Sequence, residues 1–200
     1  MEAIIFDLYD TLVRLGRETN PYRQFFELLP ANLISYEDYR KLVMTRNFDS
    51  FEEIGSYLGQ NRLAIKDLEK ELVEEVKAIE LFEDVAPGLE ILSQNFELYL
   101  LSNLASPYKK PCYTLGLDKW ISAFFFSCDI GHIKPSSEAY RYLLTAIDKK
   151  AEQVLMVGDS YKSDVEGPQK CGIQSLWLRR NAPAGEGHIR SISELVNILK

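Results

Sequence analysis

The feature that most constrains the fold is an apolar run at the start of the chain that ends abruptly in a carboxylate. Residues Ala3 to Phe6 read Ala-Ile-Ile-Phe, and Asp7 follows them directly. A short apolar run rich in β-branched residues is typical of a strand buried on both faces, as in the middle of a parallel sheet. Open α/β sheets bind ligands outside the carboxyl ends of such strands, so Asp7 is a candidate functional residue. An ordinary polar turn at Asp7 is the alternative.

Strand-like apolar runs alternate with helix-like segments in the second half of the chain. The runs are residues 98–101, 123–126, 154–157 and 175–178. We predict a short helix that follows Pro87-Gly88 and ends near residue 95, and further helices over residues 107–115, 136–147, 164–171 and 192–199. Regular alternation of strands and helices predicts an α/β fold, with a mainly parallel sheet covered by helices on both faces.

Residues 22 to 79 have a different pattern, in which apolar side chains recur three or four positions apart. This spacing predicts amphipathic helices. Breaks between them are expected near Pro30, residues 47–51 and residues 59–61. A segment of roughly 60 residues is far too long for a connection between neighbouring strands. We therefore expect an α/β core domain formed by residues 1–13 and 81–200, with an all-helical unit inserted at residues 14–80.

Charge and composition narrow the class of partner. The chain carries 23 lysines and arginines against 30 aspartates and glutamates, a net charge of −7, which argues against binding to nucleic acid or to anionic membranes. No run approaches the roughly 20 apolar residues of a membrane span, and the N-terminal run is too short for a leader. The 3 cysteines lack CxxC spacing and indicate reduced thiols. We expect a cytoplasmic protein with a small-molecule substrate; the composition does not indicate an oligomeric state.

Polar side chains follow the predicted strands at the points where the strands end. Besides Asp7, these are Ser102-Asn103, Lys134 and Asp159. Because the carboxyl ends of parallel strands lie along one edge of a sheet, we expect these groups to converge on one crevice. Phosphoryl transfer through a carboxylate nucleophile would require such a set: a nucleophile, donor groups that stabilise the transferred phosphoryl, and a second carboxylate that helps hold Mg²⁺.

Four segments resemble, in order and spacing, the motifs of the haloacid dehalogenase (HAD) superfamily of hydrolases. They are Asp7-Leu8-Tyr9-Asp10-Thr11-Leu12, Leu101-Ser102-Asn103, Lys134-Pro135, and Val157-Gly158-Asp159-Ser160 with Asp164 and Gly167. The resemblance covers nearly the whole chain. It implies a Rossmann-like core, with residues 14–80 forming a mobile helical cap that closes over the site and excludes water.

The resemblance also implies a role for each matching residue. Asp7 would be the nucleophile, and Lys134 would neutralise the nucleophile and the phosphate. Ser102 and Asn103 would bind the transferring group of a small phosphorylated substrate. The implied activity is that of a phosphatase acting on a small phosphate monoester through an aspartyl phosphate.

A Mg²⁺ site is implied by the same resemblance. Its protein ligands would be Asp7, Asp159 and the main-chain carbonyl of Tyr9, while Asp164 would act through water or orient Lys134. Mg²⁺ favours oxygen ligands, and without a cation two carboxylates beside a phosphate would repel it.

Tyr9 departs from the family pattern, in which a second aspartate two residues after the nucleophile serves as general acid and then base. Asp10 occupies the next position, and we expect it to point elsewhere because successive side chains diverge. Tyrosine has an unperturbed pKa of about 10 and is a poor substitute base. Since a positioned acid or base is worth typically about 10²–10⁴-fold, we expect a phosphatase of low activity.

Two other functions are compatible with the sequence. Tyrosine at this position resembles the haloacid dehalogenases, which use the aspartate on carbon without metal and bind halide through a cap arginine; Arg40 and Arg46 are candidates by position. Asp159 argues against this alternative, because another carboxylate would repel a carboxylate substrate. The third alternative is a catalytically weak protein that binds a ligand or partner.

Overall fold

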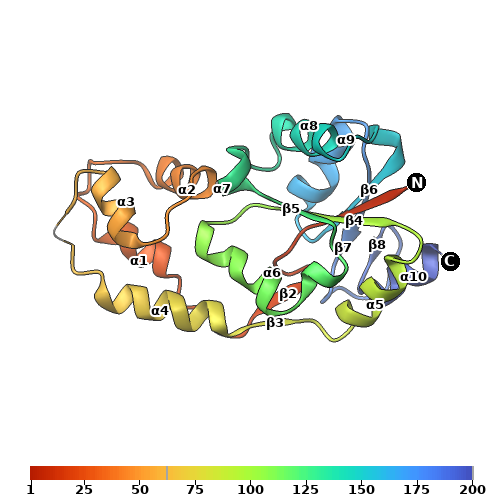
Figure 1. Cartoon of the computed structure of the whole chain (residues 1–200), viewed down its shortest axis with the longest axis horizontal. Coiled ribbons are helices and arrows are strands. Elements are labelled where there is room, and N and C mark those ends of the chain that lie inside the picture. Colours follow the sequence, from red (N-terminus) through yellow and green to blue (C-terminus); the bar gives the residue numbers. More distant parts are fainter. Residues whose placement is uncertain (62, 200) are drawn as a thin grey trace.

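The computed structural model describes residues 1–61 and 63–199, which contain a six-stranded sheet and a separate two-stranded sheet. The six strands lie in the order β5-β4-β1-β6-β7-β8, and every pairing is parallel. Their bounds are β1 Ala3–Phe6, β4 Glu97–Ser102, β5 Ala123–Phe126, β6 Val154–Gly158, β7 Gln174–Leu178 and β8 His188–Ile189. Strand β1 lies inside the sheet between β4 and β6 (Figure 1). The predicted α/β fold with a parallel sheet is confirmed.

Successive side chains of β1 enter two different hydrophobic clusters. The helices concerned are α5 Val85–Leu92, α6 Lys110–Thr114, α8 Ser137–Ala146 and α10 Ile192–Leu199. Ile4 and Phe6 share a cluster with side chains of α5, α6 and α10, whereas Ala3 and Ile5 share one with α8. All four β1 side chains are fully buried. Since neighbouring strand residues face opposite sides, the uninterrupted apolar run reflects helices on both faces of the sheet (Figure 1).

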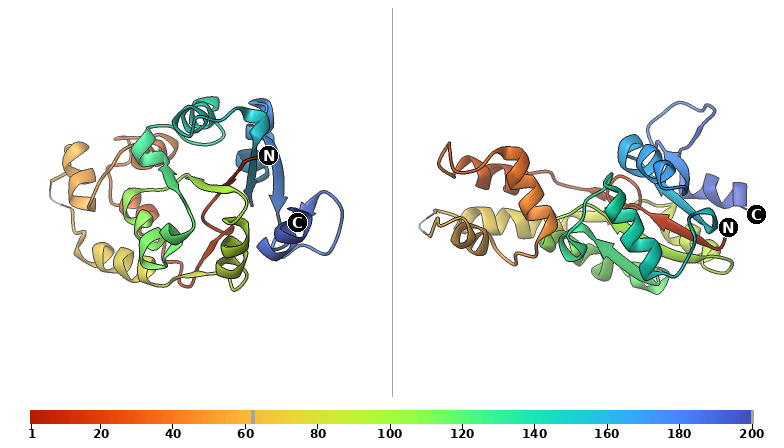
Figure 2. Two further views of the ribbon diagram at one scale, coloured as in Figure 1. Left: turned by 45° about the vertical axis from the view of Figure 1, so that its right-hand side comes forward. Right: turned by 90° about the horizontal axis from the view of Figure 1, so that it is seen from above.

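A second group of helices lies at one end of the molecule (Figure 2). These helices are α1 Pro21–Glu27, α2 Tyr36–Thr45, α3 Phe51–Tyr57 and α4 Lys66–Lys77. They share a hydrophobic cluster of their own, which includes the buried Phe25, Tyr39, Phe51 and Ile54. The helical periodicity of this segment is therefore explained by packing of the helices against one another.

Two short strands that the sequence does not predict connect this helical group with the core. Strands β2 (Val13–Leu15) and β3 (Ile79–Leu81) pair antiparallel, and Arg14 forms an ion pair with Glu80, 66 residues later, across the pair. Three residues carry too little alternation for a strand to be recognised, and the pairing is non-local. The prediction that the helical pattern continues to residue 79 is wrong at its end for this reason.

Helix α5 begins earlier than predicted. It starts at Val85, so Pro87-Gly88 lies within the helix rather than before it. Proline is tolerated in a first helical turn because its missing N–H would have no intrahelical partner there. A Cβ atom on Gly88 would overlap the side chain of Ile192 on α10. The Pro-Gly pair, usually a turn signal, here permits close packing of two helices.

Other segments differ from the prediction in form. Residues 107–115 contain a 3-10 turn, η1 (Ser106–Lys109), followed by α6, and the predicted helix at 164–171 is a π-helical turn, η4 (Tyr161–Glu166), followed by α9 (Gly167–Lys170). Helix α7 (Ser127–Ile130) and strand β8 are not predicted. The part of the chain that the structure describes holds no helix of the length and apolarity needed to span a bilayer.

Candidate functional site

The carboxyl ends of three neighbouring strands bring polar groups to one edge of the sheet. Asp7 follows β1, Ser102 ends β4 and Asp159 follows β6, and β1 pairs with both other strands. The main-chain N–H of Asp7 donates to the carbonyl oxygen of Val157 at 3.0 Å. Asp7 and Ser102 are buried. The convergence expected of a parallel sheet is therefore present, in an environment largely withdrawn from water.

Lys134 lies at the centre of this group. Its Nζ donates to Oδ1 of Asp7 and to Oδ1 of Asp164, at 2.7 Å in each case, and its side chain is only 2% exposed. Burial by itself would lower the pKa of Lys134, but the charges of Asp164 and Asp7 outweigh burial and raise the pKa above its usual value. The ammonium group therefore stays charged between the two carboxylates.

Asn103 holds the loop that carries Lys134. Its side-chain Nδ2 donates to the carbonyl oxygen of Lys134, and its Oδ1 accepts from the N–H of Lys134, both at 2.8 Å. This reciprocal pair fixes the backbone at residue 134 relative to the end of β4. Contact of Ser102 and Asn103 with a transferring group stays a prediction.

Three carboxylates meet beside Lys134. Asp7, Asp159 and Asp164 each offer an oxygen within 4.8 Å of the others. Burial, followed by the charges of Asp7 and Asp164, raises the pKa of Asp159 to about 7. Burial also raises the pKa of Asp164, although the charge of Lys134 opposes the shift. A single ammonium leaves this cluster with excess negative charge, and a set of carboxylate oxygens fits a hard divalent cation such as Mg²⁺.

Gly158 explains how Asp164 reaches the cluster. A Cβ atom at position 158 would overlap the Asp164 side chain. The carboxylate is fixed from its own loop, because Asp164 Oδ2 accepts from the N–H of Ser160 at 3.0 Å. The glycine next to Asp159 therefore has a packing function that its place in the motif did not reveal.

The side chain of Tyr9 is tied away from this cluster. Its hydroxyl donates to the main-chain carbonyl of Tyr108 at 3.1 Å, and the two rings pack edge to face with centroids 6.0 Å apart. Burial raises the pKa of Tyr9 above its usual value. Asp10, at a left-handed φ of 57°, lines a separate pocket together with Asp159 and Arg180. Tyr9 and Asp10 therefore face different spaces.

A cavity of 240 Å³ lies between the helical group and the core. Asn103 and Tyr9 line it from the core side, and Arg40 lines it from α2. The other side chains around it are mainly aromatic or apolar: Leu15, Asn20, Tyr22, Arg23, Tyr36, Tyr39, Val43, Met44, Glu75, Leu104, Ala105 and Tyr108. Arg46, the other candidate arginine, instead packs over the ring of Tyr57 at 5.0 Å. Of the two arginines, only Arg40 contributes to this cavity.

Glu75 is a buried carboxylate that the sequence does not single out. Its oxygens accept hydrogen bonds from Thr19 and Asn20, next to α1, and from the hydroxyl of Tyr108 in the core. Glu75 therefore joins the helical group to the core at the cavity wall. A glutamate within an amphipathic helix reads as solvent-exposed, so only the tertiary contacts reveal this function.

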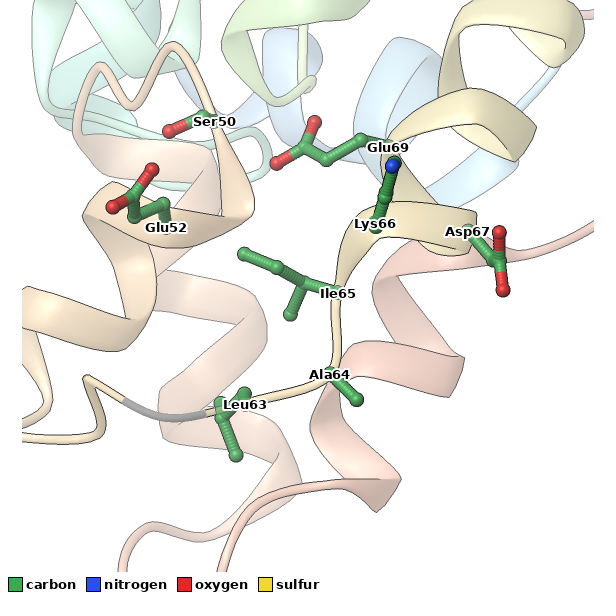
Figure 3. A pocket seen from close by; sticks show the side chains of 8 residues that line it. All are labelled: Ser50, Glu52, Leu63, Ala64, Ile65, Lys66, Asp67 and Glu69. Atoms are coloured by element: carbon green, nitrogen blue, oxygen red, sulfur yellow. The ribbon is translucent and has the colours of Figure 1, made fainter.

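A third pocket, of 510 Å³, lies within the helical group (Figure 3). It is formed by residues around the start of α3, such as Ser50 and Glu52, and by the segment from Leu63 to Glu69 that leads into α4. Asp7, Asp159, Asp164 and Lys134 do not line it. Size alone therefore does not identify the candidate site, which is defined by the carboxylate cluster.

Comparison with known proteins agrees with this geometry. Residues 1–172 match the family model of haloacid dehalogenase-like hydrolases. The HAD-hydrolase YfnB of Bacillus subtilis is 33% identical over 117 residues, which cover 54% of this chain and 49% of YfnB. Pyrophosphatase PpaX of Halalkalibacterium halodurans is 25% identical over 205 residues, covering 95% of this chain and 88% of PpaX. The matched region thus spans about half the length of YfnB.

Solved structures share the fold over the whole chain. YfnB bound to magnesium superposes with a TM-score of 0.68 at 23% identity, covering 100% of this chain and 99% of YfnB. The 2-haloacid dehalogenase of Pseudomonas syringae superposes with a TM-score of 0.64 at 18% identity. The match covers 100% of this chain and 98% of the dehalogenase chain. The fold is therefore shared by a hydrolase bound to magnesium and by a dehalogenase. With the family match over residues 1–172, this establishes that the chain belongs to the haloacid dehalogenase-like hydrolases.

Proposed function

We propose that this protein is a Mg²⁺-dependent phosphatase that acts on a small phosphate monoester through an aspartyl phosphate on Asp7. The observation that carries the proposal is the cluster of three carboxylates around one ammonium group, with Lys134 2.7 Å from both Asp7 and Asp164. Such a cluster attracts a divalent cation, and the cation in turn makes the crevice suitable for a phosphate dianion. Pyrophosphatase PpaX, which matches 95% of the chain, adds support for phosphate chemistry.

In this proposal each residue of the cluster has one task. Asp7 attacks phosphorus, and Lys134 balances the negative charge of the nucleophile and of the transferred group. Ser102 and Asn103 border the position of the phosphoryl group. Mg²⁺ would be held by Asp7, Asp159 and the carbonyl of Tyr9, with Asp164 acting through water. When bound, the cation neutralises charge so that a phosphate can approach the carboxylates.

The proposal includes a division of the chain into two domains. Residues 1–13 and 81–200 would form the core, and residues 14–80 would form a cap over the site. The separate hydrophobic cluster of α1 to α4 supports this division, as do β2 and β3, where the chain leaves and re-enters the core. A cap that moves about this two-stranded sheet would control access to the cavity and exclude water.

A dehalogenase-like hydrolase is the second candidate. Tyr9 and the presence of Arg40 at the cavity favour it, and the fold is shared with a 2-haloacid dehalogenase. The position of Asp159 opposes it, since the carboxylate cluster would repel a carboxylate substrate without a cation. A protein that binds a ligand or partner with little catalysis is the third candidate, favoured by the lack of an acid at position 9.

Turnover of p-nitrophenyl phosphate and of haloacetate, with Mg²⁺ or with EDTA, separates these candidates. We expect phosphate release that requires Mg²⁺ and is lost in Asp7→Asn. Asp67→Asn, which alters an aspartate whose side chain is 92% exposed on α4, is the matched control and should keep the wild-type rate. Phosphate release that survives EDTA contradicts the Mg²⁺ proposal, and halide release favours the dehalogenase. No turnover of either substrate favours the binding protein.

A further inference from the structure

We propose that Trp177 and Arg180, at and just beyond the carboxyl end of β7, are positioning residues for the Mg²⁺ site. Each donates hydrogen bonds to a main-chain carbonyl oxygen of one of the two loops from which the site takes its proposed ligands. The inference rests on the proposed function, because it concerns the cation which that function requires.

Trp177 holds the loop that begins with Asp159. Its indole Nε1–H donates to the main-chain carbonyl of Asp159 at 2.7 Å. The pairing of β6 with β7 runs as far as Gly158 and Trp177, so this side chain reaches the first residue beyond the paired strands. Because the rotamers open to a side chain depend on its main-chain angles, the hydrogen bond restrains the direction of the Asp159 carboxylate, a proposed ligand.

The indole ring of Trp177 is itself fixed by its neighbours. The guanidinium of Arg179 lies over the ring, 4.6 Å from its centroid, and Tyr161 packs edge to face against it with centroids 5.0 Å apart. His188 of β8 packs edge to face at 6.5 Å. Tyr161 begins the π-helical turn η4, which carries Asp164. Trp177 therefore contacts the segment after β6 at two places, its first residue and the turn that carries Asp164.

Arg180 holds the loop that follows Asp7. Its Nε and Nη2 both donate to the main-chain carbonyl of Thr11, at 3.1 and 2.5 Å, and its Nη1 donates to Asp84 at 2.9 Å. The side chain of Arg180 is only 12% exposed, and its rigid fork of donors fixes direction as well as distance. Thr11 lies two residues after Tyr9, whose carbonyl is another proposed ligand. The contact therefore restrains the turn that presents this carbonyl.

Open space lies beside both loops. A pocket of 440 Å³ is lined by Asp10, Asp159, Phe82 and residues 177–183. Empty space supplies no packing contacts, so directed hydrogen bonds from residues beyond β7 must restrain the loops where they border the pocket. Groups that hold metal ligands in this way typically change metal affinity about 10–100-fold when they are removed. The affinity for Mg²⁺ is therefore the property that should respond.

Calorimetry with Mg²⁺ tests the contact made by Trp177. Trp177→Phe keeps an aromatic ring but removes the N–H donor, and we expect it to raise the Kd for Mg²⁺ at least about tenfold. Trp120→Phe is the matched control, because the indole of Trp120 also donates to an oxygen, on Glu90 at 2.6 Å. Trp120 lines a pocket with Met1 and Glu97, near the amino ends of β1 and β4, so the Kd should stay unchanged.

Arg180→Lys tests the second contact by the same measurement. Lysine keeps the positive charge beside Asp84 but lacks the fork that donates twice to Thr11, and we expect a Kd for Mg²⁺ raised about tenfold. Arg190→Lys is the control, since Arg190 pairs with Glu194 in a partly exposed ion pair, and its Kd should equal that of the wild type. A wild-type Kd in Arg180→Lys overturns the assignment of Arg180.

Two further readouts separate positioning from a general loss of structure. The chain has 2 tryptophans, so in Trp120→Phe the emission reports Trp177; it should change as Mg²⁺ binds, and Asp159→Asn should abolish the change. With p-nitrophenyl phosphate, Trp177→Phe should need at least about tenfold more Mg²⁺ for its half-maximal rate and regain most of the wild-type kcat once Mg²⁺ saturates. A loss of kcat that excess Mg²⁺ does not restore overturns the positioning role of Trp177.

The outcomes distinguish this inference from the proposed function. Binding of Mg²⁺ to the wild-type protein, with an equal Kd in Trp177→Phe, overturns the assignment of Trp177 and leaves the phosphatase proposal intact. An emission of Trp177 that bound Mg²⁺ does not change has the same meaning. No binding of Mg²⁺ to the wild-type protein overturns the phosphatase proposal and this inference with it.

Discussion

The hydroxyl of Tyr9 donates its hydrogen bond to the main-chain carbonyl of Tyr108, 99 residues further along the chain. Tyr9 lies two residues after the proposed nucleophile Asp7, at the position where the resemblance of the motifs predicts a general acid. Its hydrogen bond directs the phenol to the cavity wall and away from the carboxylate cluster. The contact therefore connects the identity of residue 9 with both the rate and the substrate range of the proposed phosphatase.

Tyr9→Asp should restore an acid at this position. Because a positioned acid or base contributes about 10²–10⁴-fold, we expect kcat for glycerol 3-phosphate to rise at least about 100-fold, and kcat for aryl phosphates to rise much less. Tyr9→Phe, which removes only the hydroxyl, should change both rates by less than about threefold. Steady-state kinetics on the two esters measures the effect. Equal gains on both esters would show that residue 9 does not protonate the leaving group, because a phenolate leaves without a proton more readily than an alkoxide.

Lys134→Gln should destabilise the fold as well as abolish turnover. It leaves Asp7 and Asp164 buried without their counter-charge, and removing one partner of a buried ion pair costs about 3–5 kcal/mol. Lys149 is a matched control, because it also bridges two carboxylates, Glu2 and Glu97, whose side chains are 52% and 50% exposed. Lys149→Gln should cost less than about 1 kcal/mol. Urea denaturation near pH 7 measures the free energy of unfolding of both variants. Similar losses of stability in Lys134→Gln and Lys149→Gln would contradict the prediction.

Stabilisation by Mg²⁺ should depend on pH through Asp159. Burial, Asp7 and Asp164 raise the pKa of Asp159 from 3.8 to about 7. The folded, metal-free protein therefore binds more protons than the unfolded chain between these values, so its stability falls as the pH rises through this range. A cation that binds the ionised carboxylates offsets the loss. Mg²⁺ should raise Tm more at pH 8 than at pH 5, relative to EDTA.

The control for this pH dependence is Asp159→Asn, which removes the titrating group. It should reduce both the fall in Tm of the metal-free protein between pH 5 and pH 7 and the stabilisation by Mg²⁺ at pH 8. If Mg²⁺ raised the Tm of the wild-type protein equally at pH 5 and pH 8, cation binding would not be coupled to ionisation of Asp159.

Gly158→Ala should displace Asp164. The added Cβ would overlap the Asp164 side chain, and forcing extra volume into a packed site costs about 1–3 kcal/mol. We expect a lower Tm and a lower affinity for Mg²⁺, measured by calorimetry. Gly185→Ala is the control, since a Cβ there would meet its nearest neighbour, His188, at an ordinary 3.4 Å. An unchanged affinity of Gly158→Ala for Mg²⁺ would show that Asp164 does not contribute to the cation site.

Arg40→Gln and Arg46→Gln test whether an anionic group of the substrate reaches the cavity. Arg40 lines the cavity, whereas Arg46 packs over Tyr57. For carboxyphenyl phosphates we expect Arg40→Gln to raise KM about three- to tenfold, which corresponds to one ordinary hydrogen bond of about 0.5–1.5 kcal/mol. Arg46→Gln should leave KM unchanged. Equal changes in KM for the two variants would show that Arg40 does not contact the substrate.

The order of elements and the convergence of the polar groups could be predicted because both depend on local pattern. Ala3 to Phe6 is apolar at every position, which only burial on both faces explains, and the sheet places this strand between β4 and β6. Parallel strands then carry Asp7, Ser102 and Asp159 to one edge. The sequence alone therefore identifies the proposed nucleophile, Asp7, and the polar residues that lie beside it.

The details that decide specificity depend on contacts between distant segments. Three features of this kind are the pairing of β2 with β3, the hydrogen bond from Tyr9 to Tyr108, and the hydrogen bonds that place Glu75. They join residues 33 to 99 positions apart. A single residue type does not encode such a contact, because the direction of a side chain is set by the elements that pack against it.

The sequence by itself determined a parallel α/β core and the chemical groups at its strand ends, since alternation and strand-end chemistry are properties of short segments. The tertiary structure decided which way Tyr9 points and which of the two candidate arginines, Arg40 and Arg46, lines the cavity. It also leaves the hydroxyl of Tyr39 without a hydrogen-bond partner among the residues that the structure describes. These follow from the packing of the helical group on the core, which fixes the cavity wall side chain by side chain.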